Sequence, residues 1–142
     1  MADTGSTDGT QGSVRRLMAD LPGELIERPW VDFSTNRNQA LDLAQKYADY
    51  ALVIDADDTL EVDAGFTWPS LGAAAYMVEI REASATHYWR VTCPRLDAGW
   101  RWRGVLHEAL CTLPAASTPQ LPGLRILLRH NAWGLLRNLM RG

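Results

Sequence analysis

Two aspartates that could bind a metal ion follow a short apolar run near the middle of the chain. Asp55 and Asp57 come directly after the apolar residues 52–54, and Asp58 follows them. Such a run typically forms a buried strand that delivers side chains to the rim of a sheet, where α/β proteins keep their ligand sites. On an extended chain the two carboxylates leave the same face, roughly 6 to 7 Å apart. This pattern predicts a site at the strand end.

Carboxylates that converge in this way favour a cation. A hard divalent ion such as Mg²⁺ or Mn²⁺, bound through one or two carboxylates and the phosphates of a substrate, fits an Asp-x-Asp pair. The alternative is a solvated acidic turn that starts the next loop. The surrounding elements must decide between these interpretations.

The segments before the acidic residues alternate between helix and strand patterns. An apolar stripe predicts an amphipathic helix after an N-terminal segment rich in Asp, Gly, Ser and Thr, which is either turn chemistry or only a helix cap. Residues 24–28 alternate as a strand, and Ser34 or Thr35 is expected to cap a second helix that leads into residues 51–54. This βα order predicts a parallel sheet. The residues expected to face inward are Val14, Leu17, Met18 and Leu21 in the first helix, and Ala40, Leu41, Ala44 and Tyr47 in the second.

The chain changes character after the acidic residues. Residues 76–82 and 88–93 are rich in aromatic and β-branched side chains and predict two strands joined by a turn at 83–86, and residues 124–128 predict a final strand. Strands without intervening helices indicate the mixed or antiparallel part of a sheet. Trp89, Trp100 and Trp102 then either line a groove for a sugar or peptide or fill the core.

Four segments together resemble family 2 glycosyltransferases of the GT-A fold. They are residues 3–10 (DTGSTDGT), residues 36–40 (NRNQA), the Asp-x-Asp pair and residues 101–108 (RWRGVLHE). The resemblance covers roughly residues 3 to 130 and implies an α/β, Rossmann-like fold with a mixed sheet flanked by helices. The family's first strand precedes the DTGS segment, so we expect an N-terminally truncated GT-A domain over 1–130. A basic and apolar tail, expected to be helical, follows over 131–142.

The resemblance also assigns roles to particular residues. Asp3 is expected to contact the nucleotide base, and Arg37 the nucleotide or its phosphates. Asp55 and Asp57, with His130 after the last strand, are expected to hold Mn²⁺ or Mg²⁺ against the diphosphate of a sugar donor, most simply a UDP-sugar.

Residues 107–108 are the candidates for proton chemistry. An inverting transfer needs a base for the acceptor hydroxyl, and we expect Glu108 to be that base with His107 orienting it or binding the diphosphate or the metal. The acceptor can be a glycan, a protein or a small molecule. The alternatives are a structural His-Glu pair at 107–108 and a purely structural His130.

Two other functions fit parts of the pattern. A degenerate glycosyltransferase-like domain could bind a sugar or a partner without turnover. Residues 52–60 also resemble the first motif of haloacid-dehalogenase-like phosphatases, in which Asp55 would be the nucleophile and Asp57 the general acid/base. That family needs a late acidic pair, and no acidic residue follows Glu108.

Composition fits an enzyme of one domain. The chain has 142 residues, of which 46% are hydrophobic and 22% charged. Its net charge of −3 argues against general nucleic-acid binding, and a cytoplasmic location is the default expectation. Cys93 and Cys111 have no metal-ligand spacing and are expected to be reduced. The arginine-rich tail either lies on a membrane surface or a partner, or packs on the sheet.

Overall fold

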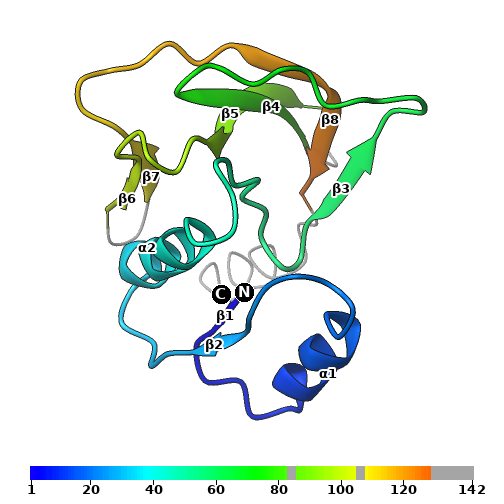
Figure 1. Ribbon diagram of the computed structural model, residues 1–142, viewed down its shortest axis with the longest axis vertical. Helices are drawn as coiled ribbons and strands as arrows, with labels where there is room; N and C mark the ends of the chain where they lie inside the picture. The colour runs from blue at the N-terminus through cyan, green and yellow to red at the C-terminus, as the bar shows by residue number, and fades with distance from the viewer. Residues whose placement is uncertain (83–85, 105–107, 129–142) are drawn as a thin grey trace, which may run out of the picture. The chain divides into compact units, whose positions relative to one another are not determined.

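The computed structural model describes residues 1–82, 86–104 and 108–128. The chain divides into two compact units, drawn in Figure 1. The N-terminal unit comprises Met1–Ala51 and Arg95–Ala116, and the sheet unit comprises Leu52–Pro94 and Ser117–Gly142. The predicted helical tail and the domain boundary at residue 130 lie outside the described residues. No helix in the described part of the chain is long and apolar enough to cross a membrane.

The N-terminal unit combines two helices with two small sheets. Strands β1 (Ala2–Asp3) and β2 (Ile26–Glu27) pair in parallel, and helix α1 (Thr10–Leu17) lies between them in sequence. Strands β6 (Arg101–Arg103) and β7 (Ala109–Cys111) form an antiparallel pair.

Helix α2 (Phe33–Ala44) starts with a side-chain cap and buries two leucines. The Asp32 carboxylate accepts a hydrogen bond from the Thr35 backbone N–H at 2.7 Å, which satisfies one of the free donors of the first turn. Leu41 and Leu43 are 4% and 7% exposed. The cap is therefore two or three residues earlier than the predicted Ser34 or Thr35, because the Asp32 side chain reaches forward to the first turn of the helix.

The sheet unit is built on one mixed, four-stranded sheet. Its strands are β3 (Thr59–Val62), β4 (Ala75–Arg81), β5 (His87–Pro94) and β8 (Gln120–Leu127), in the order β3-β8-β4-β5. The β4–β8 pair is parallel, and the β3–β8 and β4–β5 pairs are antiparallel. The alternating pattern of β4 and β8 buries Val78, Ile80 and Ile126 completely, so this sheet holds the core of its unit.

One glycine of β8 is required by its surroundings. Gly123 has φ +90°, and a Cβ atom at this position would lie 2.6 Å from Cδ2 of Phe66. The Gly123 carbonyl also accepts a hydrogen bond from the Asp63 N–H at 2.9 Å. Only glycine allows this backbone conformation and close ring contact together.

The structure confirms some predicted elements and corrects others. The strands predicted at 76–82, 88–93 and 124–128 are β4, β5 and β8, and the predicted mixed sheet is present. The parallel sheet that the βα order predicted is limited to the β1–β2 and β4–β8 pairs. The strand predicted at 52–54 is not formed as a regular strand.

The inward faces predicted for the two helices are also partly wrong. Leu17 and Leu21 are 80% and 61% exposed, because α1 ends at Leu17 and the stripe continues beyond the helix. Tyr47 lies after the end of α2 and is 54% exposed.

Candidate functional site

The Asp-x-Asp pair lies in a turn of the sheet unit. The Asp58 N–H donates to the Asp55 carbonyl oxygen at 3.0 Å, which closes a tight turn. The residues before it run along β5, since the Val53 N–H donates to the Thr92 carbonyl at 2.8 Å. The prediction of two carboxylates on one face of an extended strand is therefore wrong, because the chain turns between them.

The turn provides hard oxygen donors that suit a divalent ion. Asp57 is exposed, and Asp55 is half-buried beside it. No group of three or more His, Cys, Asp or Glu side chains that could hold a metal ion occurs among the described residues. Two carboxylates can contribute ligands to Mg²⁺ or Mn²⁺, which also take water and phosphate oxygens as ligands. The predicted third ligand, His130, lies outside the described residues.

Asp3 organises the N-terminal loop. Its Oδ2 atom accepts hydrogen bonds from the backbone N–H groups of Gly5 and Ser6, both at 3.1 Å, and from the Gln11 side chain at 2.9 Å. The Ser6 side chain and these donors together hold the pKa of Asp3 below its usual range. A contact with a nucleotide base stays a prediction, while the loop gives Asp3 a structural role that the sequence also allowed.

Arg37 and Glu108 form an ion pair within the N-terminal unit. Arg37 Nε lies 3.2 Å from Glu108 Oε1, and the two side chains are 25% and 14% exposed. The guanidinium also lies over the indole ring of Trp102, 4.7 Å from the ring centre. Arg37 is the fifth residue of α2 and lies beyond its first turn. The predicted partner of Glu108, His107, lies outside the described residues.

Other polar side chains of α2 bind the same segment. Asn38 exchanges two hydrogen bonds with the backbone of Trp102, and the Ser34 hydroxyl donates to the Gly104 carbonyl. Asp42 forms an ion pair with Arg101 at 2.9 Å. These contacts were not predicted from the sequence, although the spacing of the polar residues along α2 indicates that they share one helix face.

Two of the three tryptophans considered for a sugar groove belong to the core. Trp100 and Trp102 are only 6% and 8% exposed, whereas Trp89 is half-buried. The core alternative is therefore correct for Trp100 and Trp102.

The two cysteines are free, as expected. Burial raises the pKa of the Cys93 thiol to about 11, so this side chain stays protonated at neutral pH. Cys93 is therefore unsuited to be a nucleophile or a metal ligand.

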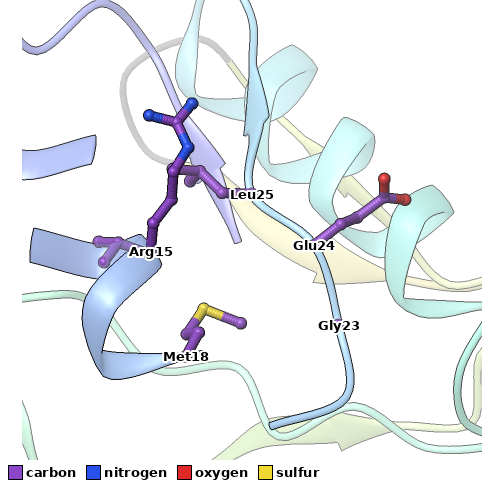
Figure 2. Close-up of a pocket in the computed structure, with 6 residues that line it drawn as sticks. Arg15, Met18, Gly23, Glu24 and Leu25 are labelled. Carbon is purple, nitrogen blue, oxygen red and sulfur yellow. The ribbon is translucent and has the colours of Figure 1, made fainter. Parts of the chain in front are cut away.

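The predicted site residues do not line the two hollows described in the structure. A hollow of about 150 Å³ lies between α1 and residues 23–25, where Figure 2 shows Arg15, Met18 and Glu24 around it. A second hollow of about 320 Å³ on the sheet unit is lined by Glu79, Arg81, Glu82, Thr86 and His87. The candidate site is therefore identified by its sequence motifs and by the contacts of its side chains, and not by a pocket.

The described residues thus define an α/β protein with an Asp-x-Asp turn in one unit and a partly buried Arg37–Glu108 ion pair in the other. Residues 1–64 match the family model described as Glycosyl transferase family 2. This match confirms the resemblance to family 2 glycosyltransferases for residues 1–64, and it supports glycosyl transfer as a general activity. A comparison with curated proteins found no match.

Proposed function

We propose that this chain is a metal-dependent glycosyltransferase that moves a sugar from a nucleotide-diphosphate donor to an acceptor hydroxyl, with inversion. The family match over residues 1–64 carries the proposal, because it includes Asp3 and the complete Asp-x-Asp turn. The proposed donor is a UDP-sugar. Residues 107–108 and His130 lie beyond the matched range, so their roles rest on the resemblance of their own segments.

Asp55 and Asp57 are the proposed ligands of Mn²⁺ or Mg²⁺. The exposed Asp57 carboxylate lies on a turn that the Asp58–Asp55 backbone hydrogen bond closes, and such a turn can present the carboxylate without a large rearrangement. The ion would stabilise the negative charge that develops on the diphosphate leaving group, an effect of several kcal/mol. The chain itself would supply the carboxylates of Asp55 and Asp57 as ligands of the ion.

Glu108 is the proposed base for the acceptor hydroxyl. The carboxylate is mostly buried, and its Oε1 atom faces Arg37. A carboxylate offers two oxygens and about four acceptor positions, so it can hold Arg37 and also accept a proton. A positioned general base contributes typically 10² to 10⁴-fold to a rate, which makes this role measurable.

Calorimetric titration of UDP into the protein, with and without Mn²⁺, tests the donor site. We expect UDP binding to require Mn²⁺ and to weaken about tenfold or more in Asp57→Ala, because the variant removes one charged ligand of the metal. Asp20→Ala is the matched control, since Asp20 is exposed and outside the motifs. Circular dichroism establishes that each variant is folded.

Two results would contradict the proposal. Binding that is unchanged by Asp57→Ala or by removal of Mn²⁺ would exclude the turn as the metal site. Absence of UDP binding in folded wild-type protein would favour a non-catalytic glycosyltransferase-like domain.

A further inference from the structure

One face of helix α2 holds the segment that carries Glu108. We propose that this face is a clamp that positions Glu108, and that Arg37 is a positioning residue that binds the Glu108 carboxylate. The inference rests on the proposed role of Glu108 as the base. The clamp residues are Ser34, Arg37, Asn38 and Asp42, and their spacing of three, four and eight positions from Ser34 places them on one side of a helix.

Asn38 anchors β6 to the helix. Its Nδ2 donates to the Trp102 carbonyl at 3.0 Å, and its Oδ1 accepts from the Trp102 N–H at 2.9 Å. This amide occupies the place that a neighbouring strand would take beside β6, since it satisfies both backbone groups of one residue. The position of the Trp102 backbone is thereby tied to α2.

The fixed indole ring then supports Arg37. Trp102 is 8% exposed, and the Arg37 guanidinium lies 4.7 Å from its ring centre. A cation over an indole face is attracted by the negative charge density of the ring, and a planar guanidinium stacks better than an ammonium. The ring therefore restricts where the guanidinium can point.

The guanidinium in turn holds Glu108. Glu108 is the residue directly before β7, and its Oε1 atom lies 3.2 Å from Arg37 Nε. Both side chains are largely buried, so water screens this pair less than a surface pair. The order of contacts runs from Asn38 to Trp102, to Arg37 and to Glu108.

Two flanking contacts fix the ends of β6. Asp42 pairs with Arg101 at 2.9 Å at its start, and Ser34 donates to the carbonyl of Gly104 just after its end. Gly104 has φ +110°, a conformation that glycine adopts without strain, so the chain can turn away from β6 at this point. The four contacts together explain why the polar residues of α2 face this segment.

In the clamp, Arg37 positions Glu108, whereas the family resemblance implies that Arg37 contacts the nucleotide or its phosphates. A phosphate contact would lose about tenfold or more in nucleotide affinity on removal of the guanidinium, as expected for a charged hydrogen bond. A clamp residue would change the surroundings of Glu108 and Trp102 and leave nucleotide affinity almost unchanged. These consequences can be measured separately.

The geometry is tested by ¹⁵N–¹H spectra of the tryptophan indole groups. The Trp102 peak is assigned through its loss in Trp102→Phe. We expect this peak to move in Arg37→Gln, which removes the cation over the ring, and also in Glu108→Gln, which releases the guanidinium. Arg15→Gln is the control, because Arg15 forms an exposed ion pair with Glu27 elsewhere in the same unit. A Trp102 peak that stays in place in both Arg37→Gln and Glu108→Gln would overturn the clamp.

The role is tested by titration of UDP and Mn²⁺ into the Arg37 variants. We expect Arg37→Gln to change the affinity less than about twofold, and Arg37→Lys to restore the charge but not the stacking, so that the Trp102 peak remains displaced. A loss of about tenfold in UDP affinity for Arg37→Gln would assign Arg37 to the donor instead. If UDP does not bind the wild type, the donor site fails while the spectra still decide the clamp.

Discussion

Both units bury apolar side chains, but in the described residues side-chain hydrogen bonds to the backbone are concentrated in the N-terminal unit. In the sheet unit, Val78, Ile80 and Ile126 have no exposed surface, and their packing follows directly from alternation along β4 and β8. In the N-terminal unit, which buries side chains such as Leu41 and Trp102, the short strands, loops and helices are also held by hydrogen bonds between side chains and the backbone. The side chains that make these bonds include Asp3, Asp32, Asn36 and Asn38.

Asn36 illustrates the polar organisation of the N-terminal unit. It is 6% exposed, accepts from the Val31 N–H at 3.0 Å and donates to the Pro29 carbonyl at 3.1 Å. The same segment leaves Trp30 and Val31 more than half exposed. This loop therefore takes its shape mainly from hydrogen bonds, since little of its apolar surface is buried.

The difference shows how motif residues can serve a fold and a reaction together. In the N-terminal unit, residues of the glycosyltransferase motifs, such as Asp3 and Asn38, are also the residues that satisfy backbone groups. In the sheet unit, the Asp-x-Asp turn is separate from the apolar core. A variant of the first kind is expected to affect stability, and a variant such as Asp57→Ala is expected to affect binding alone.

The largest stability effect is expected from truncation of the sheet core. Ile126→Ala removes a fully buried side chain from β8 and should lower the free energy of unfolding by about 2 to 5 kcal/mol. Ile54→Ala is the control, because Ile54 belongs to the same unit and is 38% exposed. Urea denaturation measures both. Equal losses for the two variants would show that the sheet core does not dominate its unit.

A polar truncation should have the next largest effect in the N-terminal unit. Asn38→Ala leaves the Trp102 N–H and carbonyl without their partner and should cost about 1 to 3 kcal/mol. Gln45→Ala at the exposed end of the same helix is the control. Urea denaturation of the two variants gives the comparison. If Asn38→Ala is as stable as Gln45→Ala, hydrogen bonds do not organise this unit as described.

The smallest expected effect is the pH dependence that Asp3 contributes. Its pKa in the folded protein is lowered, chiefly by the Ser6 side chain and then by the backbone N–H groups of Gly5 and Ser6. This stabilisation is complete above the pKa of the unfolded chain, about 3.9, and is lost as the pH falls through the lower folded value. We therefore expect Asp3→Asn to be less stable than wild type at neutral pH, with a smaller difference below pH of about 3.

Thermal unfolding across this pH range measures the effect. Asp20→Asn, at an exposed position, is the control. A constant difference between Asp3→Asn and wild type at every pH would mean that ionisation of Asp3 does not stabilise the fold.

Within the sheet unit, the sequence predicted the long strands better than the conformation of the Asp-x-Asp turn. Strands β4, β5 and β8 were predictable because their alternation and β-branched residues match their burial. Strand β3 was missed, since residues 59–62 have no long apolar pattern and Leu60 and Val62 are both exposed. The apolar residues 52–54 suggested a regular strand, but these residues form none, although the Val53 N–H donates a hydrogen bond to the Thr92 carbonyl of β5.

The sequence proposed the residues of the candidate site but not the contacts among them. The motifs pointed to Arg37 and Glu108 separately, and the family match confirms the family of the first segment. Their ion pair could not be predicted, because it depends on the tertiary packing of α2 against a segment far along the chain. The capping role of Asp32 was missed because several neighbouring residues have similar capping preferences.

The most direct test of the proposed transfer measures UDP release from a panel of UDP-sugars in the presence of Mn²⁺, with water as the acceptor hydroxyl, for wild type and Glu108→Gln. The account predicts that Glu108→Gln binds UDP as the wild type does. We expect the variant to cleave the UDP-sugar at least about 100-fold more slowly, because the base is removed while the metal ligands remain. Equal rates of UDP release for the two proteins would contradict the assignment of Glu108 as the base of a glycosyl transfer.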